Sequence, residues 1–382
     1  MARIVLMIDW YLPGTKAGGP VRSVFSLLSA MKKHYDFYVI TTNCDLGNQK
    51  PYDAIIPDSL IFEENVHYFY FSKEKKQSNE ILKLLADIKP DLIYLNSFWS
   101  YDLSIKIVRL RSKNAIACPV LLAPRGMLGK GALGIKSAKK KLFLSVAKLL
   151  GWYKEICFHA TQQQERRDIS ALFPQNKIWI APNISAGEEI INSCPKSKDH
   201  LKLFYLSRIS PVKNLKFALN ILKEVDREFT IQYDIYGNLE DLAYWLECQN
   251  LIKTMPSNIK VTYKRELQFN EVQSTISNYH ALFLPTLNEN FGHSIVESLL
   301  SGCPVIISDQ TPWNDVEKNG AGYAISLDNP EKFLKAISDI ADLNQEEFSL
   351  MSKNANKYIS QKINIIEIVS QYKNMFNDSI KN

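Results

Sequence analysis

The sequence predicts an α/β protein of two doubly wound, Rossmann-like domains that face each other across a cleft. At 382 residues the chain exceeds the size that one hydrophobic core usually supports. Each half opens in the same way, with an apolar strand, a loop, an amphipathic helix and a second strand. This alternation of short apolar runs with helical periodicity is typical of βαβ units and parallel sheets.

The first half begins with the strand RIVLMI, which a glycine-rich loop joins to the amphipathic segment VRSVFSLLSAMKK and the strand FYVITT. Apolar runs bounded by turn residues predict further strands downstream. We expect them at 91–95, 119–123, 155–161 and 177–181. The first domain is therefore expected to span 1–182.

The second half repeats the pattern with the strand LKLFYL, the loop SRISPVK, the helix NLKFALNILKEV and the strand FTIQYDIYG. Between the halves, residues 183–199 are rich in Pro, Asn, Gly and Ser, which indicates a linker. The second domain is expected to span 200–362. Its further strands are expected at 259–263, 281–285 and 304–308.

Composition excludes several classes of protein. A hydrophobic fraction of 46% with 23% charged residues is that of a soluble globular chain. The net charge of +6 is too small to indicate a nucleic-acid partner. Six cysteines without a C-x-x-C pair argue against a zinc site or disulfide framework and favour a reducing cytosol. No uncharged apolar run reaches the roughly 18 residues that span a bilayer, and we expect a cytoplasmic protein.

Loops at the carboxyl ends of parallel strands are the expected ligand sites. The loop 286–294 enters a helix whose first N–H groups, from about Phe291 to Ile295, can bind an anion. Gly292 lets a ligand approach the backbone closely.

Gly18 and Gly19 open the first helix of the other domain in a similar way. Their spacing is not the G-x-G-x-x-G dinucleotide fingerprint, which the chain lacks. Two such helix N-termini would suit a diphosphate, and the alternative is a pair of ordinary strand–helix turns.

Charged residues in the second domain leave two interpretations open. Arg208 and Lys213 follow its first strand, where a fixed cationic pair could neutralise a leaving diphosphate. Glu289 and Glu297 flank the helix start near Ser294. Ser294-x-x-Glu297 is the pattern of a capping box, in which Glu297 only binds backbone N–H groups. Alternatively, both carboxylates contact a ligand.

At these residues the sequence resembles the retaining glycosyltransferases of family four, which have the GT-B fold. NENFGHSIVE resembles their Glu-x7-Glu signature, LFYLSRISPVKNL their diphosphate-binding loop, and GGP their N-terminal glycine loop. APRGML, KKKLF, FHATQQQE, SGCPVIISDQTPW and INIIEIVSQYKNMF have counterparts in members that assemble bacterial polysaccharides. The resemblance covers nearly the whole chain. It implies that a C-terminal helix at about 363–382 packs back on the first domain.

The resemblance also implies roles for individual residues. Catalytic roles fall to Glu289, which would hold donor-sugar hydroxyls, and to Arg208 and Lys213, which would neutralise the diphosphate. Glu297 would accept the ribose hydroxyls. The donor-binding residues are expected to be Gly18, Gly19, Asn290, Phe291, Gly292, His293, Ser294 and Glu297. No metal and no cofactor other than the donor, for which a UDP-sugar is favoured, are implied.

Two positions depart from the family. Where many relatives have a histidine after the fourth strand, this chain has YLNSFWS, so that role passes to Asn96 or is absent. The loop TYKRELQ has Lys264 and Arg265 where a glycine is usual, which leaves the base, uridine or guanosine, open. His159 ends a buried strand and is either a core or interdomain histidine or a functional one.

The segment 135–153 combines lysines with an apolar face, a pattern typical of helices that lie on anionic membrane surfaces. The alternative is a helix that covers its own sheet with its lysines in water. Asn96, Arg125 and Lys130 are candidate acceptor-binding residues, the two cations for phosphates. We expect a peripheral enzyme at the inner face of the cytoplasmic membrane.

The predicted function is metal-independent, retaining transfer of a sugar from a nucleotide-diphosphate sugar to a saccharide or polyprenyl-diphosphate-linked acceptor. The rivals are a nucleotide-sugar epimerase on the same fold and a non-enzymatic two-domain sugar-binding protein. The missing glycine fingerprint argues against an NAD-dependent oxidoreductase.

Overall fold

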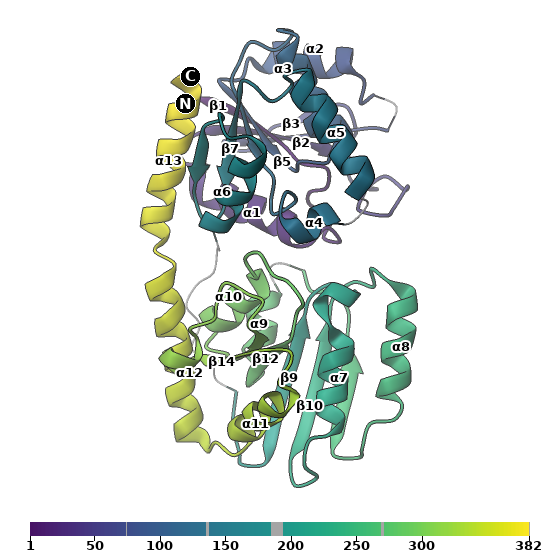
Figure 1. Ribbon diagram of the computed structural model, residues 1–382, viewed down its shortest axis with the longest axis vertical. Helices are drawn as coiled ribbons and strands as arrows, with labels where there is room; N and C mark the ends of the chain where they lie inside the picture. The colour runs from purple at the N-terminus through teal and green to yellow at the C-terminus, as the bar shows by residue number, and fades with distance from the viewer. Residues whose placement is uncertain (74, 135–136, 185–193, 269–270, 382) are drawn as a thin grey trace. The chain divides into compact units, whose positions relative to one another are not determined.

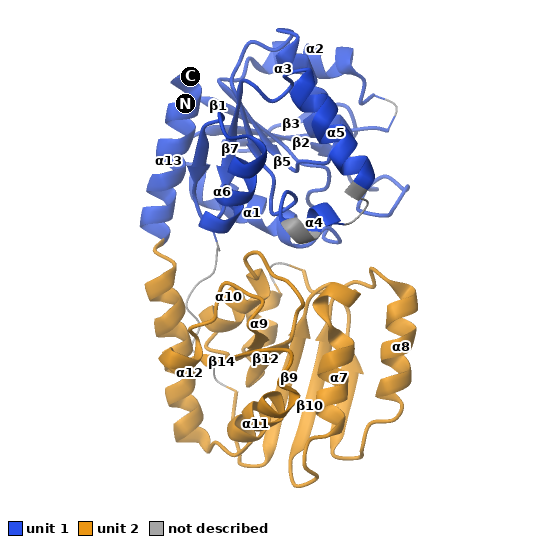
Figure 2. Cartoon of the chain, in the orientation of Figure 1, with its two compact units in different colours: residues 1–184, 365–382 blue, residues 185–364 orange. Residues whose placement is uncertain are grey.

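The computed structural model describes residues 1–73, 75–134, 137–184, 194–268 and 271–381. The chain divides into two units, which are shown in Figure 2. Unit 1 comprises 1–184 and 365–382, and unit 2 comprises 185–364. Most of the expected linker lies outside the described residues.

Unit 1 is built on a sheet whose strands are β1 (Arg3–Met7), β2 (Asp36–Thr42), β3 (Leu60–Ile61), β4 (Val66–Phe71), β5 (Leu92–Asn96), β6 (Val120–Ala123), β7 (Ile156–Ala160) and β8 (Ile178–Ile180). Their order is β3-β4-β2-β1-β5-β6-β7-β8, and only the β3–β4 pair is antiparallel in the described chain. Strand β5 is buried along its whole length, which requires cover on both faces.

The helices of unit 1 are α1 (Gly19–Met31), α2 (Ser78–Ile88), α3 (Lys106–Ser112), α4 (Lys130–Gly134), α5 (Ser137–Leu149), α6 (Gln163–Leu172) and α13 (Ile365–Lys381). A π-helical turn, Tyr101–Ile105, precedes α3. The C-terminal helix α13 lies along this unit (Figure 1). Phe376 is fully buried 5.5 Å from the rings of Tyr35 and Tyr94, and Asn377 accepts a hydrogen bond from Tyr35.

Unit 2 contains β9 (His200–Leu206), β10 (Thr230–Tyr236), β11 (Ile259–Tyr263), β12 (Ala281–Leu284), β13 (Val305–Ser308) and β14 (Gly322–Ile325). Their order is β11-β10-β9-β12-β13-β14, and the pairs are parallel. The helices are α7 (Leu215–Lys223), α8 (Leu242–Ile252), α9 (Val272–Ile276), α10 (His293–Leu300), α11 (Pro330–Ala341) and α12 (Gln345–Lys362). Short 3-10 turns span Pro211–Lys213 and Glu317–Asn319.

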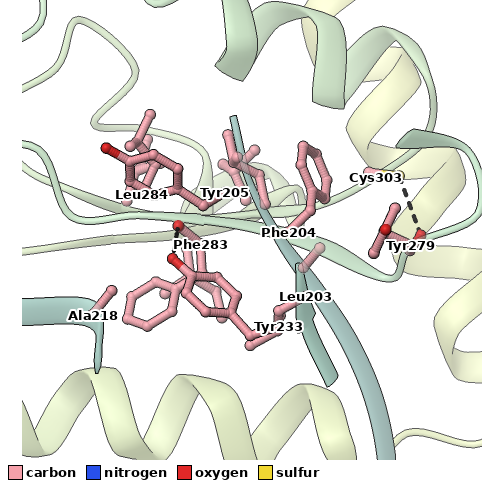
Figure 3. Close-up of a cluster of buried hydrophobic side chains, with 14 of the residues drawn as sticks. Leu203, Phe204, Tyr205, Ala218, Tyr233, Tyr279, Phe283, Leu284 and Cys303 are labelled. Atoms are coloured by element: carbon pink, nitrogen blue, oxygen red, sulfur yellow. Dashed lines mark hydrogen bonds between the residues drawn. The ribbon is translucent and has the colours of Figure 1, made fainter. Parts of the chain in front are cut away.

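The core of unit 2 is formed by apolar side chains of the central strands (Figure 3). Tyr233 and Phe283 are fully buried, and the Tyr233 hydroxyl donates to the Phe283 carbonyl at 3.0 Å. A buried tyrosine hydroxyl would otherwise lose its hydrogen bonds to water, so this contact removes the cost of placing it in the core.

Three strands were not expected from the sequence. β3 and β14 are short edge strands, whose two and four residues carry little periodic signal. The third missed strand, β4, is the more serious omission because it lies inside the sheet between β3 and β2. Its sequence, VHYFYF, carries the aromatic and β-branched residues that are typical of a strand. No helix in the described ranges is long and apolar enough to cross a membrane.

His280 is a buried histidine that fixes the entry into β9. Its Nδ1 accepts a hydrogen bond from the Lys202 backbone N–H at 2.9 Å. Its Nε2 lies 3.0 Å from the Pro195 carbonyl and, opposite this acceptor, must carry the ring proton. Burial lowers the pKa of His280 to about 4. The ring is therefore neutral in the folded protein at neutral pH.

We predict that unit 2 loses stability as the pH falls. The pKa of His280 is near 6.5 in the unfolded chain and about 4 in the folded one. Between these pH values the unfolded state binds more protons, so acidification favours unfolding. The His280 contribution should fall by about 2 kcal/mol from pH 7 to pH 5. Urea unfolding of the full chain at both pH values should show this loss, and His280→Gln should remove it. An equal effect of the exposed His200→Gln would contradict the assignment.

Candidate functional site

The two central strands of unit 2, β9 and β12, are neighbours from which the sheet grows in opposite directions. β10 and β11 lie beyond β9, while β13 and β14 lie beyond β12. The loops that follow β9 and β12 therefore lie at the point where the strand order reverses, the edge at which doubly wound sheets bind ligands. The structure places the candidate residues from 208 to 213 and from 289 to 297 on these loops and on α10.

Hydrogen bonds join the two loops. The Val212 carbonyl accepts from the Leu287 N–H at 2.8 Å and from the Thr286 hydroxyl at 3.1 Å. The Asn214 side-chain amide donates to the Pro285 carbonyl at 3.0 Å. Three cross-links over so few residues hold the two backbones at a fixed separation, so rearrangement at this edge falls to the side chains.

Lys213 and Glu289 form an ion pair across this junction. Their Nζ and Oε2 atoms are 2.6 Å apart, and the side chains are 9% and 18% exposed. Low exposure limits screening by water and salt, so the attraction is stronger than that of a surface pair. The sequence predicted both residues as site residues but did not predict that they contact each other.

Arg208 pairs with Glu240, a residue that the sequence analysis missed. Its guanidinium lies 2.6 Å from Glu240 Oε1, and both side chains are 37% exposed. Arg208 and Lys213 thus each pair with a carboxylate, a feature that the sequence did not predict. The sequence offered one signal, the glycine at position 237. Gly237 directly follows β10, and a Cβ there would lie 1.8 Å from the Ser207 carbonyl oxygen. This close approach brings the loop of Glu240 beside that of Arg208.

The start of α10 excludes the capping-box interpretation. The helix begins at His293, with Gly292 as its N-cap in the left-handed region at φ 79°. Ser294 is thus the second helical residue, and the third, which a capping box needs to be Glu or Gln, is Ile295. Glu297 lies further along the helix and is 3% exposed. The positive end of the helix dipole remains at the loop, where an anion is stabilised.

Trp313, which follows β13, contacts the backbone of the loop 286–294. Its Nε1 donates to the Phe291 carbonyl at 2.6 Å, and the two rings lie 5.9 Å apart. The ring of Phe291 also lies 4.9 Å from that of His293. The carbonyl of Phe291, two residues before the helix, is thereby held by a side chain from the segment after β13. Among the described residues, no group of three His, Cys, Asp or Glu side chains is placed to hold a metal ion.

In unit 1 the change of direction lies between β1 and β5. Gly18 is the N-cap of α1 at φ 64°, and Gly19 is the first residue of that helix. Asp45 organises the loop before them, since its carboxylate accepts from the Thr15 N–H at 3.1 Å. A side chain at Gly14 would meet the Tyr52 hydroxyl at 2.2 Å, so the loop requires glycine there.

Arg125 lies at the centre of a hydrogen-bond network. Its NH2 donates to Asn96 Oδ1 at 2.6 Å and to the Tyr94 hydroxyl at 3.1 Å, and its NH1 donates to Asn183. Tyr372 of α13 lies near the guanidinium and interacts with it electrostatically. The structure therefore brings two of the candidate acceptor residues, Asn96 and Arg125, together. The side chain of the third, Lys130, lies outside the described residues.

His159 is a core histidine, one of the two alternatives left open. Its Nδ1 is 2.7 Å from the Tyr94 hydroxyl, and its Nε2 is 2.8 Å from the Ala181 carbonyl. The carbonyl only accepts, so Nε2 carries the proton and Tyr94 donates to Nδ1. Burial and the Arg125 charge lower the pKa of His159 to about 3. Both ring nitrogens are committed within the unit.

Parts of this chain are similar to known glycosyltransferases. Residues 186–358 match the family model described as glycosyl transferases group 1. Over 100 residues, 26% of this chain and 28% of the relative, identity to the O-antigen chain mannosyltransferase RfbU of Salmonella typhimurium is 33%. Over 114 residues, 30% of this chain and 29% of the relative, identity to the UDP-Gal:alpha-D-GlcNAc-diphosphoundecaprenol alpha-1,3-galactosyltransferase of Escherichia coli is 27%. The chain aligns with less than a third of either relative.

A solved structure matches both units. The HepE protein of Anabaena, in complex with UDP and glucose, has a TM-score of 0.70 at 15% identity, over 99% of this chain and 100% of that one. At this identity the likeness shows the fold, two Rossmann-like domains of the GT-B type. The expected fold class and the resemblance to a glycosyltransferase family are confirmed.

We predict that Gly292→Ala weakens nucleotide binding and destabilises unit 2. A left-handed alanine costs about 1–2 kcal/mol. Its Cβ would also lie 2.8 Å from Ile295 Cδ1 and 3.1 Å from Glu289 Cγ, which displaces the carboxylate. Urea unfolding and calorimetric titration with UDP measure the two effects. Gly47→Ala is the control, because φ is 76° there and no atom lies within 4 Å of the new Cβ. If Gly292→Ala binds UDP as tightly as wild type, Gly292 does not belong to the nucleotide-binding site.

Proposed function

We propose that this chain, whose residues 186–358 belong to the glycosyl transferases group 1 family, is a retaining glycosyltransferase that needs no metal ion. Unit 2 would bind a nucleotide-diphosphate sugar, and unit 1 would bind a saccharide or polyprenyl-diphosphate-linked acceptor. The observation that carries the proposal is the junction of β9 and β12, where Lys213, Arg208 and the positive end of α10 lie at one sheet edge. Such a combination suits a diphosphate.

Each candidate residue has a distinct task in this proposal. Arg208 and Lys213 would neutralise the charge that develops on the diphosphate as the sugar leaves. Glu289 would accept hydrogen bonds from sugar hydroxyls, and Glu297 from the ribose diol. The bond from the anomeric carbon to the diphosphate would break while the acceptor oxygen attacks from the same face, and the acceptor proton would pass to the departing diphosphate. Glu289 therefore binds the sugar and forms no covalent bond to it.

Uridine is the favoured base. The similar structure of HepE contains UDP and glucose, and the galactosyltransferase relative is named for a UDP-sugar. The name of that relative also contains a diphosphoundecaprenol-linked acceptor, which supports a lipid-linked acceptor here. An acceptor phosphate at Arg125 would compete with Asn96 and Asn183, which already hold its guanidinium.

A membrane surface is the proposed partner of α5, at the inner face of the cytoplasmic membrane. Leu142, Val146 and Leu149 share one helix face, and Leu142 and Leu149 are 68% and 86% exposed. Lys139 and Lys141 are exposed beside them, which adds attraction to anionic lipid. Lys140 instead donates to the Ala132 carbonyl at 2.5 Å and is expected to contribute less. The first two residues of the segment 135–153 lie outside the described ranges.

The proposed activity is tested by incubating the chain with nucleotide sugars and lipid-linked acceptors and by following transfer. Thermal stabilisation by one nucleotide sugar selects the donor first. Conversion of the donor without any acceptor would favour an epimerase, and binding without conversion would favour a sugar-binding protein.

We predict that Arg208→Ala mainly lowers kcat. Loss of one charge-stabilising contact should raise the barrier by about 2.7–4 kcal/mol, or about 10²–10³ in rate. Steady-state kinetics with varied donor measure it. The control is Lys216→Ala, which removes an exposed cation of unit 2 that pairs with Glu247. Normal kcat with a raised donor KM would instead assign Arg208 to uniform substrate binding.

We also predict that Lys139→Gln with Lys141→Gln releases the chain from anionic vesicles. About 1 kcal/mol per lysine corresponds to roughly thirtyfold for the pair. Sedimentation with vesicles of phosphatidylglycerol and phosphatidylethanolamine measures the loss. Replacing two exposed lysines of unit 2, Lys318 and Lys332, should have little effect. A wild-type chain that does not sediment with these vesicles would exclude the proposed surface.

A further inference from the structure

Four charged side chains lie at the carboxyl edge of β9 and β12, called the donor edge here, and their formal charges cancel. Arg208 and Lys213 contribute two positive charges, and Glu240 and Glu289, each 2.6 Å from its partner, contribute two negative ones. A diphosphate entering this edge therefore meets cations that are already neutralised. The diphosphate gains the full attraction of a cation only if the ion pair between that cation and its carboxylate breaks.

The two ion pairs differ in how strongly they resist this exchange. Arg208–Glu240 is 37% exposed on both sides, so water and salt weaken it and replace its hydrogen bonds at little cost. Lys213–Glu289 is largely shielded, at 9% and 18% exposure. If Lys213 turned to a phosphate, Glu289 would remain as a shielded carboxylate that needs another hydrogen-bond donor.

The backbone around the Lys213–Glu289 pair is fixed. The Leu287 N–H donates to the Val212 carbonyl at 2.8 Å, and the Glu289 N–H donates to the Gln310 carbonyl at 3.0 Å. Asn214 is held to Pro285 on the other side of Lys213. Exchange of partners therefore involves rotation of two side chains about a fixed frame.

We infer that the Lys213–Glu289 ion pair makes this edge discriminate between the nucleotide sugar and the free nucleotide. The inference rests on the proposed function and extends it to product release. With the donor bound, sugar hydroxyls donate to Glu289, so Lys213 is free to donate to the diphosphate. After transfer the sugar is gone, Glu289 has no donor, and Lys213 returns to it. The nucleoside diphosphate loses a cation at that moment and is released.

The test is calorimetric titration of the full-length chain with UDP and, separately, with GDP. Glu289→Gln keeps the shape of the side chain and removes its charge, so Lys213 is free for the diphosphate. Glu289→Gln should therefore bind the nucleoside diphosphate at least about tenfold more tightly than wild type, which corresponds to about 1.4 kcal/mol. Glu240→Gln, the matched change in the exposed pair, should alter affinity at most about fivefold.

A second variant assigns the gain to Lys213. In a Lys213→Met background, Glu289→Gln should give no gain, because the exchanged cation is absent. Unchanged or weaker UDP affinity of Glu289→Gln, or a gain that persists without Lys213, would overturn the inference and leave the proposed function standing. If neither wild type nor Glu289→Gln binds UDP or GDP, and wild type also binds no UDP-sugar or GDP-sugar, the proposed function itself fails.

Discussion

The parallel pairing of β9 with β12, Leu203 beside Ala281 and Phe204 beside Leu282, is the constraint on which the candidate site depends. These strands are separated by more than 70 residues of sequence, yet their carboxyl ends emerge side by side. The next strands continue in opposite directions, so the two loops lie at the point where the strand order reverses. Hydrogen bonds from Thr286 and Leu287 to Val212 then fix the loops to each other.

This fixed frame explains why the site needs few special side chains. The preceding strand, β12, sets the direction of the α10 dipole. Gly292 supplies the left-handed backbone from which the helix starts. Trp313, in the segment that follows β13, holds the carbonyl of Phe291. The remaining freedom belongs to the long side chains of Lys213, Glu289 and their neighbours. A frame that is organised before a ligand binds has little reorganisation left to undergo during the reaction.

In unit 1, side-chain hydrogen bonds fix the loop that contains Arg125. Arg125 has a left-handed backbone at φ 55°, and its guanidinium donates to side chains of β5 and to Asn183 and lies near Tyr372 of α13. A half-buried guanidinium requires this many acceptors, because each N–H removed from water without a partner costs free energy. The same contacts attach the C-terminal helix to the loop. Position 125 is therefore structural as well as a candidate for acceptor binding.

The sequence by itself determined the two α/β halves, most central strands and the glycines at both helix starts. These features are local, because strand runs, helical periodicity and backbone requirements depend on neighbouring residues. It also placed Arg208, Lys213, Glu289 and Glu297 in loops or at a helix start.

Only the tertiary structure decided which of these charges meet. Lys213 and Glu289 are 76 residues apart, and Arg208 and Glu240 are 32 apart, so no local pattern records either pair. The N-cap also lies two residues before the Ser294 that the capping pattern suggested, because Gly292 adopts the left-handed backbone at φ 79° from which the helix starts. Contacts between distant strands follow from sheet order, and sheet order is a property of the folded chain.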